Sequence, residues 1–296
     1  MFTHLTHHVN GQTIRAAHAG PDDAPVLLML HGFPEYWTAW SDVAAHLTGA
    51  FHCVLPDQRG CGASSKPPHV EDYETKRLVA DMAALIDEVS PGRPIMLAGH
   101  DWGASVAYAL AFRHADRIAR LVIANGVHPM CFQRALFEDE AQARASQYIH
   151  VLRDPASDTR MAEDGFSRTF RMFEKFSTAP WLDETRREAF RDVWEEALPT
   201  MLHWYRATPM VVPEEKDGRI APRAFPFSDD MLSRFRVAMP HLVVWGERDT
   251  ALLPSCLEGL DRFCENVRIE TLPDASHWLL HERPDVVAEH IREFLI

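Results

Sequence analysis

The chain has 296 residues, with 30 Lys and Arg against 43 Asp and Glu, and a formal net charge of -13. Its apolar fraction of 46% and charged fraction of 25% are typical of a globular protein, and no apolar run approaches the ~20 residues that span a bilayer. The acidic balance disfavours nucleic acid and anionic membranes as partners, so we expect neither.

The first part of the chain alternates between short apolar runs and helix-length periodic segments. The pair Asn10-Gly11 between two alternating segments predicts a β-hairpin. Strands are then expected over residues 26–30, 52–55, 94–98 and 118–124, and helices near 40–47 and over 75–89 and 104–114. Such alternation predicts a mainly parallel sheet flanked by helices.

Residues 127–227 lack strand signals and carry helical, aromatic-rich sequence. Four phenylalanines recur there at helix-like intervals: Phe166, Phe170, Phe173 and Phe176. A stripe with this spacing is more often helical core than a ligand site. Prolines and a glycine mark a loop at the end of the segment: Pro213, Gly218, Pro222 and Pro226.

The strand and helix rhythm then resumes, with strands expected over residues 242–245 and 267–272 and helices over 254–263 and 284–294. We therefore predict one α/β core domain made of residues 1–126 and 228–296. A helical cap at residues 127–227 is expected as an insertion into it.

The run from Ala98 to Gly103 carries the most specific signal. It follows an apolar stretch and precedes small helix formers, and a glycine stands two residues before and after Asp101. This pattern is typical of the nucleophile elbow of the α/β-hydrolase fold, where most enzymes have serine. A carboxylate attacks a saturated carbon and leaves an ester, which favours opening of an epoxide or a carbon–halogen bond over acyl transfer.

A carboxylate nucleophile needs a base that activates water and an acid that orients the base. Asp249 and His277 each follow a predicted strand, in the order nucleophile, acid, histidine that this fold uses. Asp249 could instead cap a helix near residue 254, and His277 could be a buried packing residue. Glu247 and Asp274 compete for the acid role but lie further from the loop apex.

The segment His31-Gly32-Phe33-Pro34 follows the strand over residues 26–30. Its position matches the loop that supplies the second oxyanion donor of the fold, so the backbone amides of Phe33 and Trp102 are expected to form the oxyanion hole. The alternative is a tight turn, because Pro34 restricts the residue before it.

Several motifs together resemble the soluble epoxide hydrolases of the α/β-hydrolase superfamily, across nearly the whole chain. They are His31–Pro34, the segment 56–60 with Gly62, the segment 64–67, and Gly99–Gly103. The resemblance implies two cap tyrosines that bind the epoxide oxygen and donate a proton, and Tyr148 and Tyr205 match those places. Either tyrosine could instead be a packing residue. The resemblance also implies a structural role for Arg59.

Other activities share this frame. A haloalkane dehalogenase would use the same Asp–His–Asp machinery, with Trp102 holding the halide; one branch of that family has asparagine where this chain has Phe33. A fluoroacetate dehalogenase has arginines after the nucleophile, which this chain lacks. An aspartate at position 101 does not suit an esterase. A receptor built on an inactive hydrolase scaffold would lack part of the catalytic machinery, whereas this chain has a candidate residue for every catalytic role.

The expected substrate is a small apolar epoxide, and no cofactor is expected. The five cysteines lack metal-ligand spacing and suit reduced thiols, and the N-terminus shows no signal sequence, so we expect no metal site and a cytoplasmic enzyme. No motif bears on the oligomeric state.

Overall fold

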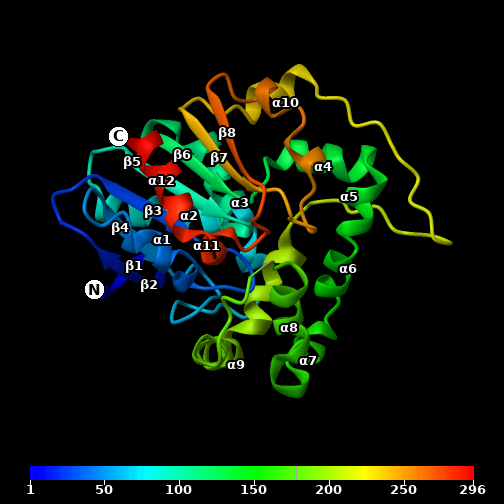
Figure 1. The fold of residues 1–296 in the computed structure, drawn as a ribbon, viewed down its shortest axis with the longest axis horizontal. Helices are drawn as coiled ribbons and strands as arrows, with labels where there is room; N and C mark the ends of the chain where they lie inside the picture. The colour runs from blue at the N-terminus through cyan, green and yellow to red at the C-terminus, as the bar shows by residue number, and fades with distance from the viewer. Residues whose placement is uncertain (178) are drawn as a thin grey trace.

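A computed structural model describes residues 1–177 and 179–296 (Figure 1). Eight strands form one sheet in the order β1-β2-β4-β3-β5-β6-β7-β8. They are β1 (Thr3–Val9), β2 (Gln12–Ala19), β3 (Val26–Leu30), β4 (His52–Pro56), β5 (Ile95–His100), β6 (Ile118–Ala124), β7 (His241–Gly246) and β8 (Val267–Leu272). Only the β1–β2 and β2–β4 pairs are antiparallel. The predicted hairpin and mainly parallel sheet are confirmed.

Helices cover both faces of this sheet, because its central strands are apolar on both sides. In β3, Leu28 belongs to the apolar cluster under α2 and α3, whereas Leu27 belongs to the cluster under α1 and α12. These helices are α1 (Ser41–Ala45), α2 (Thr75–Val89), α3 (Trp102–Arg113), α11 (Leu279–Glu282) and α12 (Pro284–Leu295), with short 3-10 turns η1 (Trp37–Trp40), η2 (Val70–Tyr73) and η3 (Ala115–Arg117).

Between β6 and β7 the chain forms a separate group of helices beside the sheet (Figure 1). They are α4 (Pro129–Glu138), α5 (Glu140–Ala145), α6 (Tyr148–Arg153), α7 (Ser157–Arg160), α8 (Glu163–Lys175) and α9 (Glu184–Ala207). The four phenylalanines expected to pack are buried, and three of them contact the Trp194 ring of α9. A loop leads on to α10 (Asp229–Arg234), as the prolines predicted.

The helix expected over residues 254–263 is wrong. The chain forms two separate 3-10 turns there, η4 (Pro254–Leu257) and η5 (Leu260–Arg262). Gly259 lies between them with φ of 80°, a left-handed conformation that ends a right-handed helix. A Cβ at this position would lie 2.8 Å from the Phe227 ring, so the loop packs where a side chain would stand.

Candidate active site

Asp101 is the single residue between β5 and α3. Its φ of 50° and ψ of -120° are rare for a residue with a side chain. The turn is tight because the chain crosses itself closely: a Cβ at Gly103 would lie 2.1 Å from the Leu30 carbonyl oxygen, and one at Gly99 would lie 2.6 Å from the Gly103 oxygen. The two glycines thus allow a strained turn that presents the carboxylate at the carboxyl-terminal end of β5, a central strand of the sheet.

The two carboxylate oxygens of Asp101 have different surroundings. The Phe33 backbone N–H donates to Oδ1 at 2.7 Å, and the Trp102 amide also hydrogen-bonds the carboxylate. Oδ2 lies 3.7 Å from His277 Nε2. Burial raises the pKa of Asp101, opposed by His277, His100 and the two amides. Oδ1 is therefore held by the Phe33 amide, while Oδ2 is the oxygen on the side of His277.

Asp249 and His277 form a buried pair. His277 Nδ1 lies 2.7 Å from Asp249 Oδ2. Burial alone would raise the pKa of Asp249, but the charge and hydrogen bond of His277 hold it below its usual value. Conversely, burial alone would lower the pKa of His277, but Asp249 and Asp101 raise it to about 9. The pair can orient the imidazole with Nε2 toward Asp101.

Asp249 also accepts hydrogen bonds from its own loop, at 2.7 Å from the Ala251 N–H and 2.9 Å from the Leu252 N–H, both to Oδ1. Asp249 does not cap the turn that begins at Pro254, whose N-cap is Leu253 without a side-chain hydrogen bond, so the capping alternative is wrong. The two competing acids lie elsewhere: Glu247 is exposed, and the exposed Asp274 forms an ion pair with Arg283.

Asn125 is a site residue whose role we did not predict from the sequence. It follows β6, is fully buried, and donates from Nδ2 to Asp249 Oδ2 at 2.6 Å. Its Oδ1 accepts from the Gly246 N–H at 2.6 Å, and its carbonyl accepts from the Asp101 N–H at 3.3 Å. One side chain and its backbone thereby join the nucleophile turn to the acid loop. The only signal in the sequence was its place at a strand end.

A second unpredicted group supports the histidine loop. Glu35 is fully buried, with Oε1 2.6 Å from His281 Nε2 and Oε2 3.3 Å from His100 Nδ1. The other nitrogen of His100 lies 2.9 Å from the His277 carbonyl oxygen. Burial alone would raise the pKa of Glu35, but the two imidazoles hold it far below its usual value. The motifs place Glu35 directly after the oxyanion loop and His100 directly before the nucleophile.

The two predicted tyrosines come from the inserted helices and line the same cavity as the nucleophile. Tyr148 begins α6 and Tyr205 lies near the end of α9, and their ring centroids are 6.4 Å apart. The Tyr205 ring also packs edge-on against Trp102, at 4.9 Å, and Phe33, at 5.1 Å. Burial, and then nearby charges that include Asp101, raise the pKa of both tyrosines. Both hydroxyls therefore stay protonated and able to donate.

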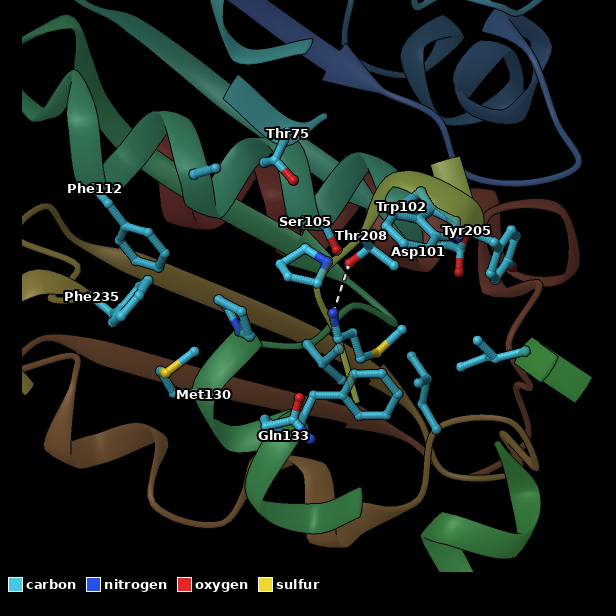
Figure 2. Close-up of a pocket in the computed structure, with 18 of the residues that line it drawn as sticks. Thr75, Asp101, Trp102, Ser105, Phe112, Met130, Gln133, Tyr205, Thr208 and Phe235 are labelled. Carbon is cyan, nitrogen blue, oxygen red and sulfur yellow. Dashed lines mark hydrogen bonds between the residues drawn. The ribbon is translucent and has the colours of Figure 1, made fainter. Parts of the chain in front are cut away.

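Asp101 and the two tyrosines open onto a cavity of about 600 Å³, shown in Figure 2. Asp101, Trp102, Tyr148 and Tyr205 line one part of it. Among residues 1–177 and 179–296, no three His, Cys, Asp or Glu side chains are grouped as a metal ion would require. In the same residues, no helix is both long and apolar enough to cross a membrane.

Arg59 lies outside this site. Its guanidinium pairs with the buried Asp81 carboxylate at 2.7 Å through both Nε and Nη2. The bidentate pair ties the loop after β4 to α2. This geometry agrees with the structural role expected for Arg59.

Known proteins are similar to this chain over most of its length. The sequence profile of the alpha/beta hydrolase fold family matches residues 25–284. Epoxide hydrolase 2 of Caenorhabditis elegans is 29% identical over 284 residues, which cover 93% of this chain and 75% of that protein.

Two solved structures are similar along almost their whole length. One, described among novel epoxide hydrolases of the alpha/beta hydrolases superfamily in metagenomes from hot environments, is 34% identical with a TM-score of 0.86, covering 100% of this chain and 99% of that one. The epoxide hydrolase of Bacillus megaterium in complex with an inhibitor is 28% identical with a TM-score of 0.85, covering 98% and 99%.

Proposed function

The chain belongs to the alpha/beta hydrolase fold family, and from that premise we propose that it is an epoxide hydrolase, which adds water to an epoxide to give a vicinal diol. The observation that carries this proposal is the grouping of Asp101, Tyr148 and Tyr205 around one cavity, with the His277–Asp249 pair beside Asp101. The similarity to epoxide hydrolases supports it.

In the first step, Asp101 Oδ2 attacks an epoxide carbon and the carbon–oxygen bond of the ring breaks. The released electron pair goes to the epoxide oxygen, which takes a proton from the hydroxyl of Tyr148 or Tyr205. Both hydroxyls have raised pKa values and stay protonated, so they can donate to an alkoxide as it forms. The product is a hydroxyalkyl ester on Asp101.

In the second step, His277 Nε2 takes a proton from a water molecule, and the oxygen of that water attacks the Asp101 carboxyl carbon. The charge on Oδ1 is held by the Phe33 and Trp102 amides, which already contact the carboxylate. The ester bond then breaks, and the diol oxygen takes the proton from His277. The proton left on the new carboxyl group goes to the tyrosinate formed in the first step. Asp101 is thus restored as a carboxylate with one oxygen from water, and the tyrosine is restored as a phenol.

Ester formation itself prepares His277 for this role. The charge of Asp101 helps to raise the pKa of His277 in the free enzyme, and the ester has no charge. The pKa of His277 therefore falls when the ester forms, which favours the neutral imidazole that a base requires.

Residues 127–227 then act as a cap over a core of residues 1–126 and 228–296. The placement of Tyr148 and Tyr205 on α6 and α9 supports this division, because the cap supplies the proton donors while the core supplies the nucleophile. The reaction needs no cofactor. Five buried, unpaired cysteines support a cytoplasmic enzyme with reduced thiols.

The test offers styrene oxide and a bromoalkane to the wild type and to Asp101→Asn, with diol and bromide measured separately. We expect diol from the wild type and not from the freshly prepared variant. A single turnover in heavy-oxygen water is expected to label the Asp101 carboxylate. Bromide without diol would show a haloalkane dehalogenase, and diol without label in Asp101 would contradict the ester mechanism.

A further inference from the structure

One polar side chain of the inserted helices is fully buried against the loop that carries Asp249. Gln142 lies in α5 and has no exposed surface. Its amide contacts the acid loop, residues 249–253, through two hydrogen bonds: Nε2 donates to the Ala251 carbonyl oxygen at 2.9 Å, and Oε1 accepts from the Leu253 N–H at 2.7 Å. A side chain more than 100 positions away in the sequence therefore holds the acid loop.

The acid loop needs such partners because it has no regular secondary structure. Residues 249–253 form neither helix nor strand, so their backbone groups lack the partners that a helix or a sheet would supply. Asp249 binds two of these groups, the N–H of Ala251 and the N–H of Leu252, through Oδ1. Gln142 binds the Ala251 carbonyl and the Leu253 N–H. The loop is therefore held between the catalytic acid and Gln142.

A single peptide group links Gln142 to Asp249. The carbonyl of Ala251 and the N–H of Leu252 belong to one planar, rigid trans peptide, whose oxygen and hydrogen point in opposite directions. The oxygen accepts from Gln142, and the N–H donates to Asp249 Oδ1 at 2.9 Å. Rotation of this peptide away from Gln142 would therefore also move the N–H away from Asp249. Because Oδ2 of the same carboxylate contacts His277 at 2.7 Å, the link continues to the base.

A simpler interpretation is that Gln142 only stabilises the contact between α5 and the core. Its other hydrogen bonds are of that kind: Nε2 also donates to Ser146 Oγ at 2.8 Å, and Oε1 also accepts from Cys256 Sγ at 3.1 Å. Buried polar groups generally have such partners. This interpretation does not account for the position of the two loop contacts, which lie directly before and directly after the Leu252 N–H that Asp249 accepts.

We propose that Gln142 is a positioning residue for ester hydrolysis, which holds the acid loop so that Asp249 keeps His277 oriented toward Asp101. This role rests on the proposed epoxide hydrolase function. Without the amide, the peptide that donates to Oδ1 is free to turn, and the Asp249 carboxylate can turn with it and lengthen its contact with His277. Attack by Asp101 does not use His277 as a base, so Gln142 acts on the second step and not on the first.

The test replaces Gln142 by methionine, which is unbranched and similar in size but cannot donate to Ala251 and accepts only weakly. Ser146→Ala is the matched control, because it removes one partner of the same amide and leaves both contacts with the acid loop. Each variant is followed through a single turnover of styrene oxide, in which the ester on Asp101 and the diol are measured with time. Urea unfolding measures the stability of each variant separately.

In Gln142→Met we expect ester hydrolysis to slow by about 10- to 100-fold, a size typical of a displaced catalytic group, and ester formation to stay unchanged. The pH profile of hydrolysis supplies a readout that a loss of stability would not move. The rate rises with pH as the imidazole of His277 becomes neutral. Asp249 raises the pKa of His277, so a weaker contact moves this rise to lower pH. Glu35 and His100, which also face His277, are unaltered. Ser146→Ala shows neither change.

Gln142→Glu tests the same link if Gln142→Met does not fold. A protonated glutamic acid can donate to Ala251 and accept from Leu253, whereas the ionised form can only accept. Burial favours the protonated form. We expect hydrolysis close to the wild-type rate at low pH, and hydrolysis slowed by up to ~10²-fold where the side chain ionises. Ester formation is expected to stay unchanged throughout.

Hydrolysis at the wild-type rate in a folded Gln142→Met, equal slowing of both steps in either variant, or Gln142→Glu that follows the wild type at every pH would overturn the positioning role. Each of these results would leave the proposed function intact. Absence of both ester and diol from the wild type would instead overturn the proposed function.

Discussion

Replacing Asp249 by asparagine separates the two proposed steps. The carboxylate accepts from His277 and Asn125 on Oδ2 and from two backbone amides on Oδ1. An asparagine can keep the amide contacts through its carbonyl oxygen, but it then turns its NH₂ toward His277 Nδ1 and the Asn125 amide. His277 must accept at Nδ1, which places its proton on Nε2 and removes its ability to take a proton from water.

The size of the effect follows from the charge and the tautomer. Against the opposing effect of burial, Asp249 and Asp101 raise the pKa of His277 from 6.5 to about 9, which corresponds to a net stabilisation of the imidazolium by about 3 kcal/mol. After ester formation only the Asp249 share of that stabilisation remains. Loss of the Asp249 share lowers the rate of ester hydrolysis by up to ~10²-fold, and the wrong tautomer raises the total loss in this rate to ~10³–10⁴-fold. Attack by Asp101 does not use His277 as a base and is expected to change by less than about tenfold.

The assay is a rapid-quench single turnover with styrene oxide, in which the ester on Asp101 is detected by the mass of the intact protein. In Asp249→Asn the ester is expected to accumulate, whereas Asp274→Asn and Glu247→Gln, the acids outside the site, are expected to behave as the wild type. Equal slowing of both steps, or hydrolysis slowed by less than tenfold, would refute the proposed role of Asp249.

Tyr148→Phe and Tyr205→Phe are each expected to slow ester formation by ~10²-fold while leaving its hydrolysis unchanged; a slowed hydrolysis in the same single-turnover assay would argue against proton donation. Asn125→Ala leaves the buried Gly246 N–H without its acceptor, so we expect a loss of about 1–3 kcal/mol in urea unfolding, and an unchanged midpoint would contradict this. Burial, with the nearby His7 and His52, lowers the pKa of His18 to about 4. The unfolded chain therefore binds this proton at a higher pH than the folded protein does, so stability that is present above pH 6.5 is lost as the pH falls toward 4. His18→Gln should flatten this part of the stability profile in urea titrations. His277 has the opposite sign, because its raised pKa gives stability that is present below pH 6.5 and lost as pH rises through about 9; His277→Gln should remove that alkaline loss.

The sequence by itself determined the features that depend on neighbouring residues. The hairpin at Asn10-Gly11 and the strands over 26–30 and 118–124 follow from turn chemistry and from apolar runs, which are local properties. The turn around Asp101 was equally readable, because the glycines two residues before and two residues after it stand in the same short stretch of sequence. Chain order then sufficed to choose Asp249 and His277 as candidates.

Only the tertiary structure decided which distant groups meet. Asn125 reaches Asp249 across 124 positions, and Glu35 reaches His281 across 246, so no local pattern could reveal either contact. The expected helix over 254–263 is interrupted at Gly259, which has a left-handed φ, and the ring of the distant Phe227 lies where a side chain at this position would stand. The cavity likewise arises from α3, α4 and α10 coming together. Periodicity and turn preferences are written in adjacent residues, whereas side-chain partners and cavities exist only after the folded chain brings remote segments into contact.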